Sequence, residues 1–175
     1  MPTFCVLYIC LKEVINLMKN IEKTNVMRIL DSKKIDYNSY CYVDSAAVNG
    51  VELAQVMGQD PERVFKTLVT VGASGKNYVF VIPVKEELDL KKAAKTVGEK
   101  SISMLKSKEL LPLTGYIHGG CSPIGMKKFF ETTFHTTAQN FEKIFFSAGK
   151  IGYQVELSLE SLKTVIEFKV NDLIC

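Results

Sequence analysis

A glycine-rich segment contains the residues best suited to bind a charged or polarised group. Residues 115–125 read GYIHGGCSPIG and hold four glycines and one proline. Glycine permits a positive φ angle or a close approach of the backbone, and proline then fixes the direction of the chain. Such a loop can point its peptide N–H groups at an anion or at a developing oxyanion. The alternative is an ordinary tight turn, and composition alone favours the turn.

Lys66 is the most informative single residue. It lies in the apolar run VFKTLV, where Val64 and Leu68 share its face of an expected strand. Because a buried, unpaired ammonium group is costly, this lysine must extend to solvent, find a partner or face a cavity. In a cavity it would offer three hydrogen-bond donors to a carbonyl, phosphate or ribose. The alternative is an edge-strand lysine that prevents aggregation, and the residues leave both open.

Other side chains allow both a functional and a structural interpretation. Tyr42 could form a polar wall or a half-buried core contact. The Ser147 hydroxyl could meet a ligand or stabilise a turn, and Cys121 is better explained as a buried, inert thiol than as a nucleophile. The pair Lys127-Lys128 is typical of a solvated face, with phosphate contact as the less favoured alternative.

Several classes of chemistry lack the residues they need. The sequence has no Ser-His-Asp set, no phosphate-binding fingerprint, and two histidines without metal-ligand spacing, so we expect no metal and no cofactor. Five scattered cysteines favour a reducing, cytoplasmic location over a disulfide framework. A net charge of +3 permits a nucleic-acid partner without requiring one.

The hydrophobic pattern predicts one α+β domain with small helices around a mostly antiparallel or mixed, barrel-like sheet. In the first half we expect helices at 22–34, 46–57, 90–97 and 107–111, a strand at 35–43, and a hairpin of 64–71 with 77–84. In the second half we expect strands at 126–134, 143–147 and 153–157, a helix from Ser158 to 166, and a closing segment at 168–174. Pro112 is expected to end the fourth helix. Residues 1–17 are interpreted as an extension, and 18–175 as the domain.

From about residue 23 to the end, the chain resembles the YbaK/EbsC-type family of aminoacyl-tRNA deacylases, which is related to the editing domain of bacterial prolyl-tRNA synthetases. The stretches that carry the resemblance are VFKTL at 64–68, LDLKKAAK at 88–95, TGY at 114–116 with GGCSPIG at 119–125, and SAGK at 147–150. They occur in the family's order, so the resemblance implies the family's α+β fold.

The resemblance also implies roles for individual residues. Lys66 matches the essential lysine, with Thr67 beside it in the pocket. Gly119, Gly120 and Pro123 match the G-x-x-x-P loop, whose N–H groups would stabilise an oxyanion. The residues that match the remainder of the substrate pocket are Tyr42, Ser147 and Gln154. Gln154 is a departure, since close relatives can carry an acid there, and Val48-Asn49-Gly50 replaces a stretch that contains Phe.

The implied function is trans-editing, in which cysteine is removed from mischarged Cys-tRNA(Pro) and also from Cys-tRNA(Cys). The substrate's own thiol would attack the ester, so no protein nucleophile is needed. The implied partners are the acceptor end of an aminoacylated tRNA and, transiently, prolyl-tRNA synthetase, with no membrane. Two alternatives stay open: a deacylase for another charged tRNA such as Ala-tRNA(Pro), and a non-catalytic module that binds tRNA or a synthetase.

Overall fold

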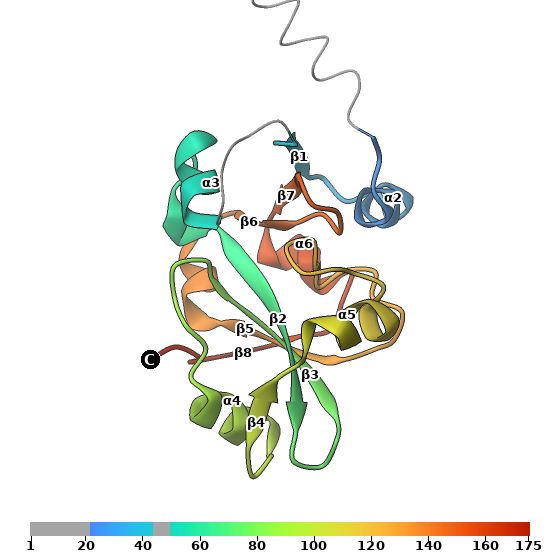
Figure 1. Ribbon diagram of the computed structural model, residues 1–175. Helices are drawn as coiled ribbons and strands as arrows, with labels where there is room; N and C mark the ends of the chain where they lie inside the picture. The colour runs from blue at the N-terminus through green and yellow to red at the C-terminus, as the bar shows by residue number, and fades with distance from the viewer. Residues whose placement is uncertain (1–21, 44–49) are drawn as a thin grey trace, which may run out of the picture.

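The computed structural model describes residues 22–43 and 50–175 (Figure 1). Within these ranges the strands form a three-stranded sheet in the order β1-β7-β6 and a five-stranded sheet in the order β4-β2-β3-β5-β8. The expected extension at 1–17 and the start of the helix expected at 46–57 lie outside the described residues, so the domain boundary stays a prediction. Among the helices in the described part, none is long and apolar enough to cross a membrane.

The elements follow one another along the chain with short connections. The helices are α2 (Asn25–Ser32), α3 (Gly50–Val56), α4 (Leu90–Val97), α5 (Ser107–Thr114) and α6 (Leu159–Lys163). The strands are β1 (Asn38–Cys41), β2 (Phe65–Gly72), β3 (Asn77–Pro83), β4 (Ile102–Met104), β5 (Glu131–His135), β6 (Ile144–Ser147), β7 (Tyr153–Leu157) and β8 (Lys169–Asn171). Single 3-10 turns occupy Pro61–Arg63 and Thr136–Asn140.

Side-chain caps set the helix boundaries that the sequence indicates. The Asp89 carboxylate accepts hydrogen bonds from the N–H groups of Lys91 and Lys92, and Gly98 ends α4 in the left-handed conformation. The Ser158 hydroxyl likewise accepts from the N–H of Ser161 at the start of α6. Helix α4 is confirmed with its predicted bounds, whereas α6 begins after Ser158 as predicted but ends at Lys163 rather than at residue 166.

Strand β2 has a different core on each of its faces. Phe65 and Val69 join the main hydrophobic cluster, which also includes buried residues of α2, β6 and β7. On the other face, Leu68 packs with the cluster beneath α4, and Val64 packs with Phe145 and Ala54 near α3. The alternation along β2 therefore places Lys66 between two small apolar clusters and turns Thr67 toward the main core.

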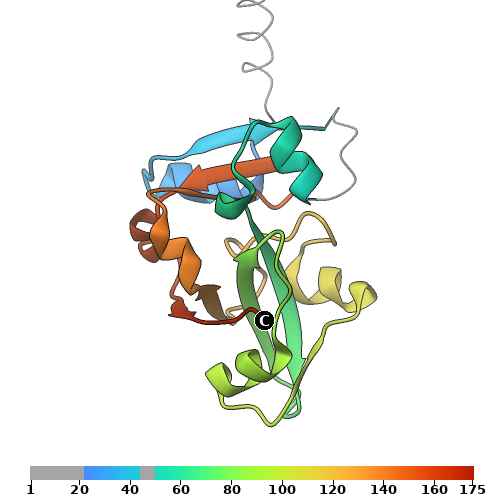
Figure 2. The same ribbon diagram turned by 90° about the vertical axis from the view of Figure 1, so that its left-hand side faces the viewer.

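The outer edge of β2 changes its neighbour part of the way along the strand. Val64 forms a parallel bridge with Phe145 of β6, whereas the pairing with β4 begins at Thr70 opposite Met104. Lys66 and Thr67 lie in the interval between. Figures 1 and 2 show the three-stranded sheet and the five-stranded sheet meeting at this end of β2. At Lys66 the outer edge of β2 is therefore paired with neither β6 nor β4.

Two expectations about the elements are wrong in detail. Helix α5 does not end at Pro112 but continues to Thr114. Two donors after the proline, the Thr114 hydroxyl and the Gly115 N–H, bond to the carbonyls of Leu110 and Leu111 before it. The strand expected at 126–134 is regular only as β5, which pairs in parallel with both β3 and β8. The five-stranded sheet is therefore mixed.

His135 connects the C-terminal segment to the sheet. Its side chain is 3% exposed, and its Nδ1 accepts a hydrogen bond of 3.0 Å from the Leu173 N–H. Burial lowers the pKa of this imidazole, although the nearby carboxylates of Asp172 and Glu86 oppose the shift. The native state therefore holds the neutral form.

This arrangement predicts a pH-dependent stability. Because the unfolded state binds a proton near pH 6.5 and the native state only at lower pH, stability is complete above about pH 6.5 and declines as the pH falls below it. Urea denaturation of the wild type between pH 5 and 7.5 should show this slope, and His135→Asn should reduce it. His118→Gln, on an exposed loop, is the matched control; an equal loss of slope in both variants would contradict the assignment.

Candidate active site

Lys66 is partly buried on an interior strand. Its side chain is 29% exposed, and its Nζ lies 3.8 Å from Oε1 of Glu87, whose own side chain is 87% exposed. An exposed partner at that distance contributes little. Although β2 lies between β4 and β3 in the sheet, Lys66 falls in the interval where the outer edge of β2 is unpaired, so the interpretation as an edge lysine stays open. The ammonium group retains donors for a ligand.

Ser147 and Gln154 lie on the face of the sheet that Lys66 shares. Lys66 and Ser147 each follow the parallel bridge between Val64 and Phe145 by two residues, so their side chains project to the same side. Ser147 stands opposite Gln154 in the β6–β7 ladder, and Gln154 stands opposite Tyr40 in the β1–β7 ladder. The register therefore brings together three of the predicted site residues from distant parts of the chain.

Gln154 is the least satisfied polar group on this face. Its side chain is 4% exposed, and its Oε1 has no hydrogen-bond partner within the described part of the protein. An unpaired buried amide oxygen costs about 1–3 kcal/mol. Ser147 accepts a hydrogen bond from the Gly149 N–H at 3.3 Å, which leaves its hydroxyl proton free to donate. The face thus offers both an acceptor and a donor.

Tyr42 and Thr67 take different positions relative to Lys66. The Tyr42 N–H donates to the Gly152 carbonyl, which extends the β1–β7 pairing, and continued alternation puts its ring on the face of Gln154. Burial raises the pKa of Tyr42, so it remains a neutral phenol. Thr67, in contrast, projects from the opposite face of β2, where its buried Oγ1 has no partner among the described residues.

A buried ionic network beside the site was not predicted from the sequence. The Glu156 carboxylate is 7% exposed and accepts hydrogen bonds from Arg63 at 2.7 Å and from Asn38 and Tyr40 at 2.9 Å each. Burial acts to raise the pKa of Glu156, but these bonds and the guanidinium charge outweigh it, and the pKa lies below its usual range. The sequence signal for this network was an acidic residue, Glu156, at an inward-facing position of the strand YQVEL.

The glycine loop is shaped by a turn and by close packing. Gly119 has φ +82°, and the Gly120 N–H donates to the Ile117 carbonyl at 3.0 Å, which closes a β-turn. A Cβ on Gly120 would lie 3.0 Å from the backbone N of Ile151 in the β6–β7 turn. This changes the expectation for Gly120, since its N–H is already bonded within the loop and is not free for an oxyanion.

The rest of the loop is held in the main core. Tyr116 donates its hydroxyl proton to the Ile124 carbonyl at 2.6 Å and packs with α2 and the β6–β7 turn. Pro123 is buried, and Cys121 is 8% exposed. Burial raises the pKa of the Cys121 thiol to about 12, so it remains protonated and is a poor nucleophile. The loop is therefore fixed by the core and by its contact with Lys150 and Ile151 in the β6–β7 turn.

Three comparisons with known proteins bear on this site. The family model of the aminoacyl-tRNA editing domain matches residues 45–165. A protein of Enterococcus faecalis, EbsC, whose name assigns it as a Cys-tRNA(Pro)/Cys-tRNA(Cys) deacylase, is 46% identical over 145 residues, covering 82% of this chain and 88% of the relative.

Solved structures agree on the fold. A crystal structure described as that of a trans-editing enzyme for prolyl-tRNA synthetase superposes with a TM-score of 0.75 at 22% identity, covering 88% of this chain and 99% of the other. A protein of unassigned function, APE2540, superposes with a TM-score of 0.77 at 19% identity, covering 86% and 99%. At such identities the likeness establishes the fold alone.

The family model and the 46% identical relative identify the class as small α+β proteins that act on aminoacyl-tRNA. The chain belongs to the aminoacyl-tRNA editing domain family. The predicted family, the predicted fold class and the prediction of an aminoacyl-tRNA deacylase are confirmed. The roles of the individual site residues stay predictions.

The ionic network predicts a measurable coupling. Arg63→Ala should lower the free energy of unfolding by about 2 kcal/mol, because it leaves the Glu156 carboxylate buried without its charged donor. Adding Glu156→Gln should recover part of that loss, since the buried charge is then gone. Urea denaturation of both single variants and of the double variant measures this, and strictly additive losses would refute the pairing.

Proposed function

We propose that this protein removes cysteine from mischarged Cys-tRNA(Pro), and also from Cys-tRNA(Cys), as its relative EbsC is named to do. The proposal is carried by the face on which a partly buried Lys66 lies beside Ser147 and the unpaired Gln154. A cation, a donor and an acceptor on one face suit a small polar ester. Removal of a cysteine is needed because a binding pocket separates small side chains by only about 10–200-fold.

The chemistry we propose uses the nucleophile of the substrate. The cysteinyl sulfur attacks the carbonyl carbon of its own ester, a C–S bond forms, the C–O bond to the ribose breaks, and the thiol proton passes to the ribose oxygen. The product is a cyclic thioester that water opens later. The protein side supports this route, because the cysteine of the loop, Cys121, is buried and its pKa is raised. The hydroxyl of Ser147 has no described histidine or carboxylate bonded to it.

The residues then act by position and charge. Lys66 orients the ester carbonyl or the terminal ribose and phosphate, and an unbonded N–H of the loop, with Gly119 as the candidate, stabilises the oxyanion. Tyr42 and Pro123 bound the pocket, Gln154 and Ser147 hold the amino acid, and Thr67 supports the lysine strand from the core side. We further propose a transient complex with prolyl-tRNA synthetase in the cytoplasm, which would supply the choice of tRNA.

The first test concerns Lys66. Lys66→Ala should reduce release of cysteine from Cys-tRNA(Pro) by about 10²–10³-fold, since an electrostatic stabiliser of the reacting carbonyl is lost. Lys66→Arg keeps the charge and tests its placement, and Lys76→Ala, on the β2–β3 turn, is the control. Equal rates for wild type and Lys66→Ala, measured under single-turnover conditions, would remove the lysine from the mechanism.

The same assay separates the alternative functions. A panel of Cys-, Ala- and Ser-charged tRNA(Pro) should show release of cysteine only, because alanine has no thiol and serine has a much weaker nucleophile. Comparable release of alanine would favour a water-dependent deacylase for Ala-tRNA(Pro). Binding of charged tRNA without release of any amino acid would favour the non-catalytic module.

A second test concerns Gln154. Gln154→Met keeps the shape and removes an amide oxygen that no described residue satisfies, so the melting temperature should stay equal or rise. If the amide holds the substrate, KM for Cys-tRNA(Pro) should rise several-fold in the same variant. A fall in stability with unchanged KM would assign Gln154 to the core instead.

A further inference from the structure

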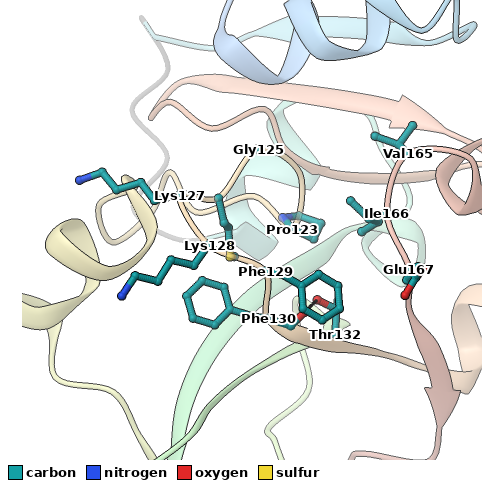
Figure 3. Close-up of a pocket in the computed structure, with 11 residues that line it drawn as sticks. Pro123, Gly125, Lys127, Lys128, Phe129, Phe130, Thr132, Val165, Ile166 and Glu167 are labelled. Carbon is teal, nitrogen blue, oxygen red and sulfur yellow. Dashed lines mark hydrogen bonds between the residues drawn. The ribbon is translucent and has the colours of Figure 1, made fainter.

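A hollow lies next to the glycine loop and outside the face of Lys66. Its volume is about 510 Å³, and Figure 3 shows the residues around it. It is lined by Pro123, Gly125, the run Met126–Phe130, Thr132, and Val165, Ile166 and Glu167 after α6. Pro123 lines the hollow and also belongs to the loop of the candidate active site. The hollow therefore adjoins the loop of the candidate active site.

An exposed aromatic ring stands on the rim of this hollow. Phe129 is 76% exposed, the highest value among the large hydrophobic side chains of the described residues. Most of this side chain is therefore accessible to a ligand. Exposed aromatic rings beside basic residues are the platforms on which single-stranded nucleic acids stack their bases.

Two lysines complete the surface. Lys127 contacts the Leu111 carbonyl at 3.4 Å, and its stem packs over Gly115, so the side chain is held in place with donors left over. Lys128 is exposed and forms no hydrogen bond or ion pair with a described residue. Figure 3 shows both ammonium groups pointing away from Glu167, on the opposite side of the hollow.

We propose that this surface, formed by Lys127, Lys128 and Phe129, binds the single-stranded 3′ end of the tRNA that carries the amino acid. The inference rests on the proposed function, because the single strand that we place on this surface is the one whose terminal ribose carries the aminoacyl ester. The phosphates lie on the lysine side, a base stacks on Phe129, and the chain passes Pro123 toward the face of Lys66. Glu167, across the hollow, is placed to accept from a base amino group and excludes phosphate from that side.

The experiment measures binding of an uncharged RNA hairpin that copies a tRNA acceptor stem and ends in single-stranded CCA. Fluorescence anisotropy should show that Phe129→Ala weakens binding by about five- to hundredfold, while Phe129→Tyr, which keeps the ring, restores most of it. A blunt hairpin without the single-stranded end should be bound equally weakly by wild type and Phe129→Ala.

The lysines are tested against a variant with the same charge change. Lys127→Ala/Lys128→Ala should weaken binding and reduce the slope of log K against log salt by about 1.4 to 1.8. Lys91→Ala/Lys95→Ala, on α4, should change the slope little, since these exposed lysines lie far from the hollow (Figure 1). Equal effects of both double variants would overturn the proposal, as would an unchanged affinity of Phe129→Ala. Thermal melting of each variant checks that it is folded.

The two proposals fail in distinguishable ways, because the hairpin carries no amino acid. Binding that depends on Lys127, Lys128 and Phe129 without any deacylation would leave this inference standing and refute the proposed function. Deacylation that depends on Lys66, with hairpin binding insensitive to these three residues, would refute this inference alone. A raised KM for Cys-tRNA(Pro) in Phe129→Ala would support both.

Discussion

The exchange of neighbours along β2 is the constraint on which the site depends. A strand that pairs with β6 at Val64 and with β4 from Thr70 must leave its outer edge unpaired in between. A sheet tolerates such an interval only if other groups satisfy or cover it, because unpaired backbone groups are costly when buried. The interval coincides with Lys66 and lies at the end of the strand that β6 approaches. The same strand pairing therefore determines both the sheet topology and the position of the candidate site.

The polar face around this interval needs its own support. A face that carries Gln154 and Ser147 cannot be stabilised by apolar packing alone. The Glu156 network lies on the same face, two residues further along β7. Arg63 also bonds the Lys143 carbonyl and lies 4.9 Å from the centroid of the Phe145 ring, so it fixes β6 against the segment that leads into β2. The ion pair therefore maintains the register on which the position of Lys66 relative to Ser147 depends.

Local chemistry made much of this fold predictable from the sequence. The cap at Asp89, the turn after β2 and the apolar runs of the β2–β3 hairpin each lie within a few residues, and each was confirmed. The pairing of Arg63 with Glu156 spans 93 residues and has no local signature. Strand β4 has three residues and no pattern, so only its contact with β2 defines it. The grouping of Lys66 with Gln154 came from the family resemblance, since periodicity could not supply it.

The glycine loop shows why residue type alone could not separate a turn from a binding loop. Gly119 is needed for its positive φ, and Gly120 because a side chain would meet the backbone of Ile151. Both requirements are structural, yet their effect is to bring the loop against Lys150 and Ile151 of the β6–β7 turn, three and four residues beyond Ser147. The same loop borders the hollow at Pro123. A turn and a binding loop are therefore compatible interpretations of the same residues, because the turn positions the peptide groups that the substrate would meet.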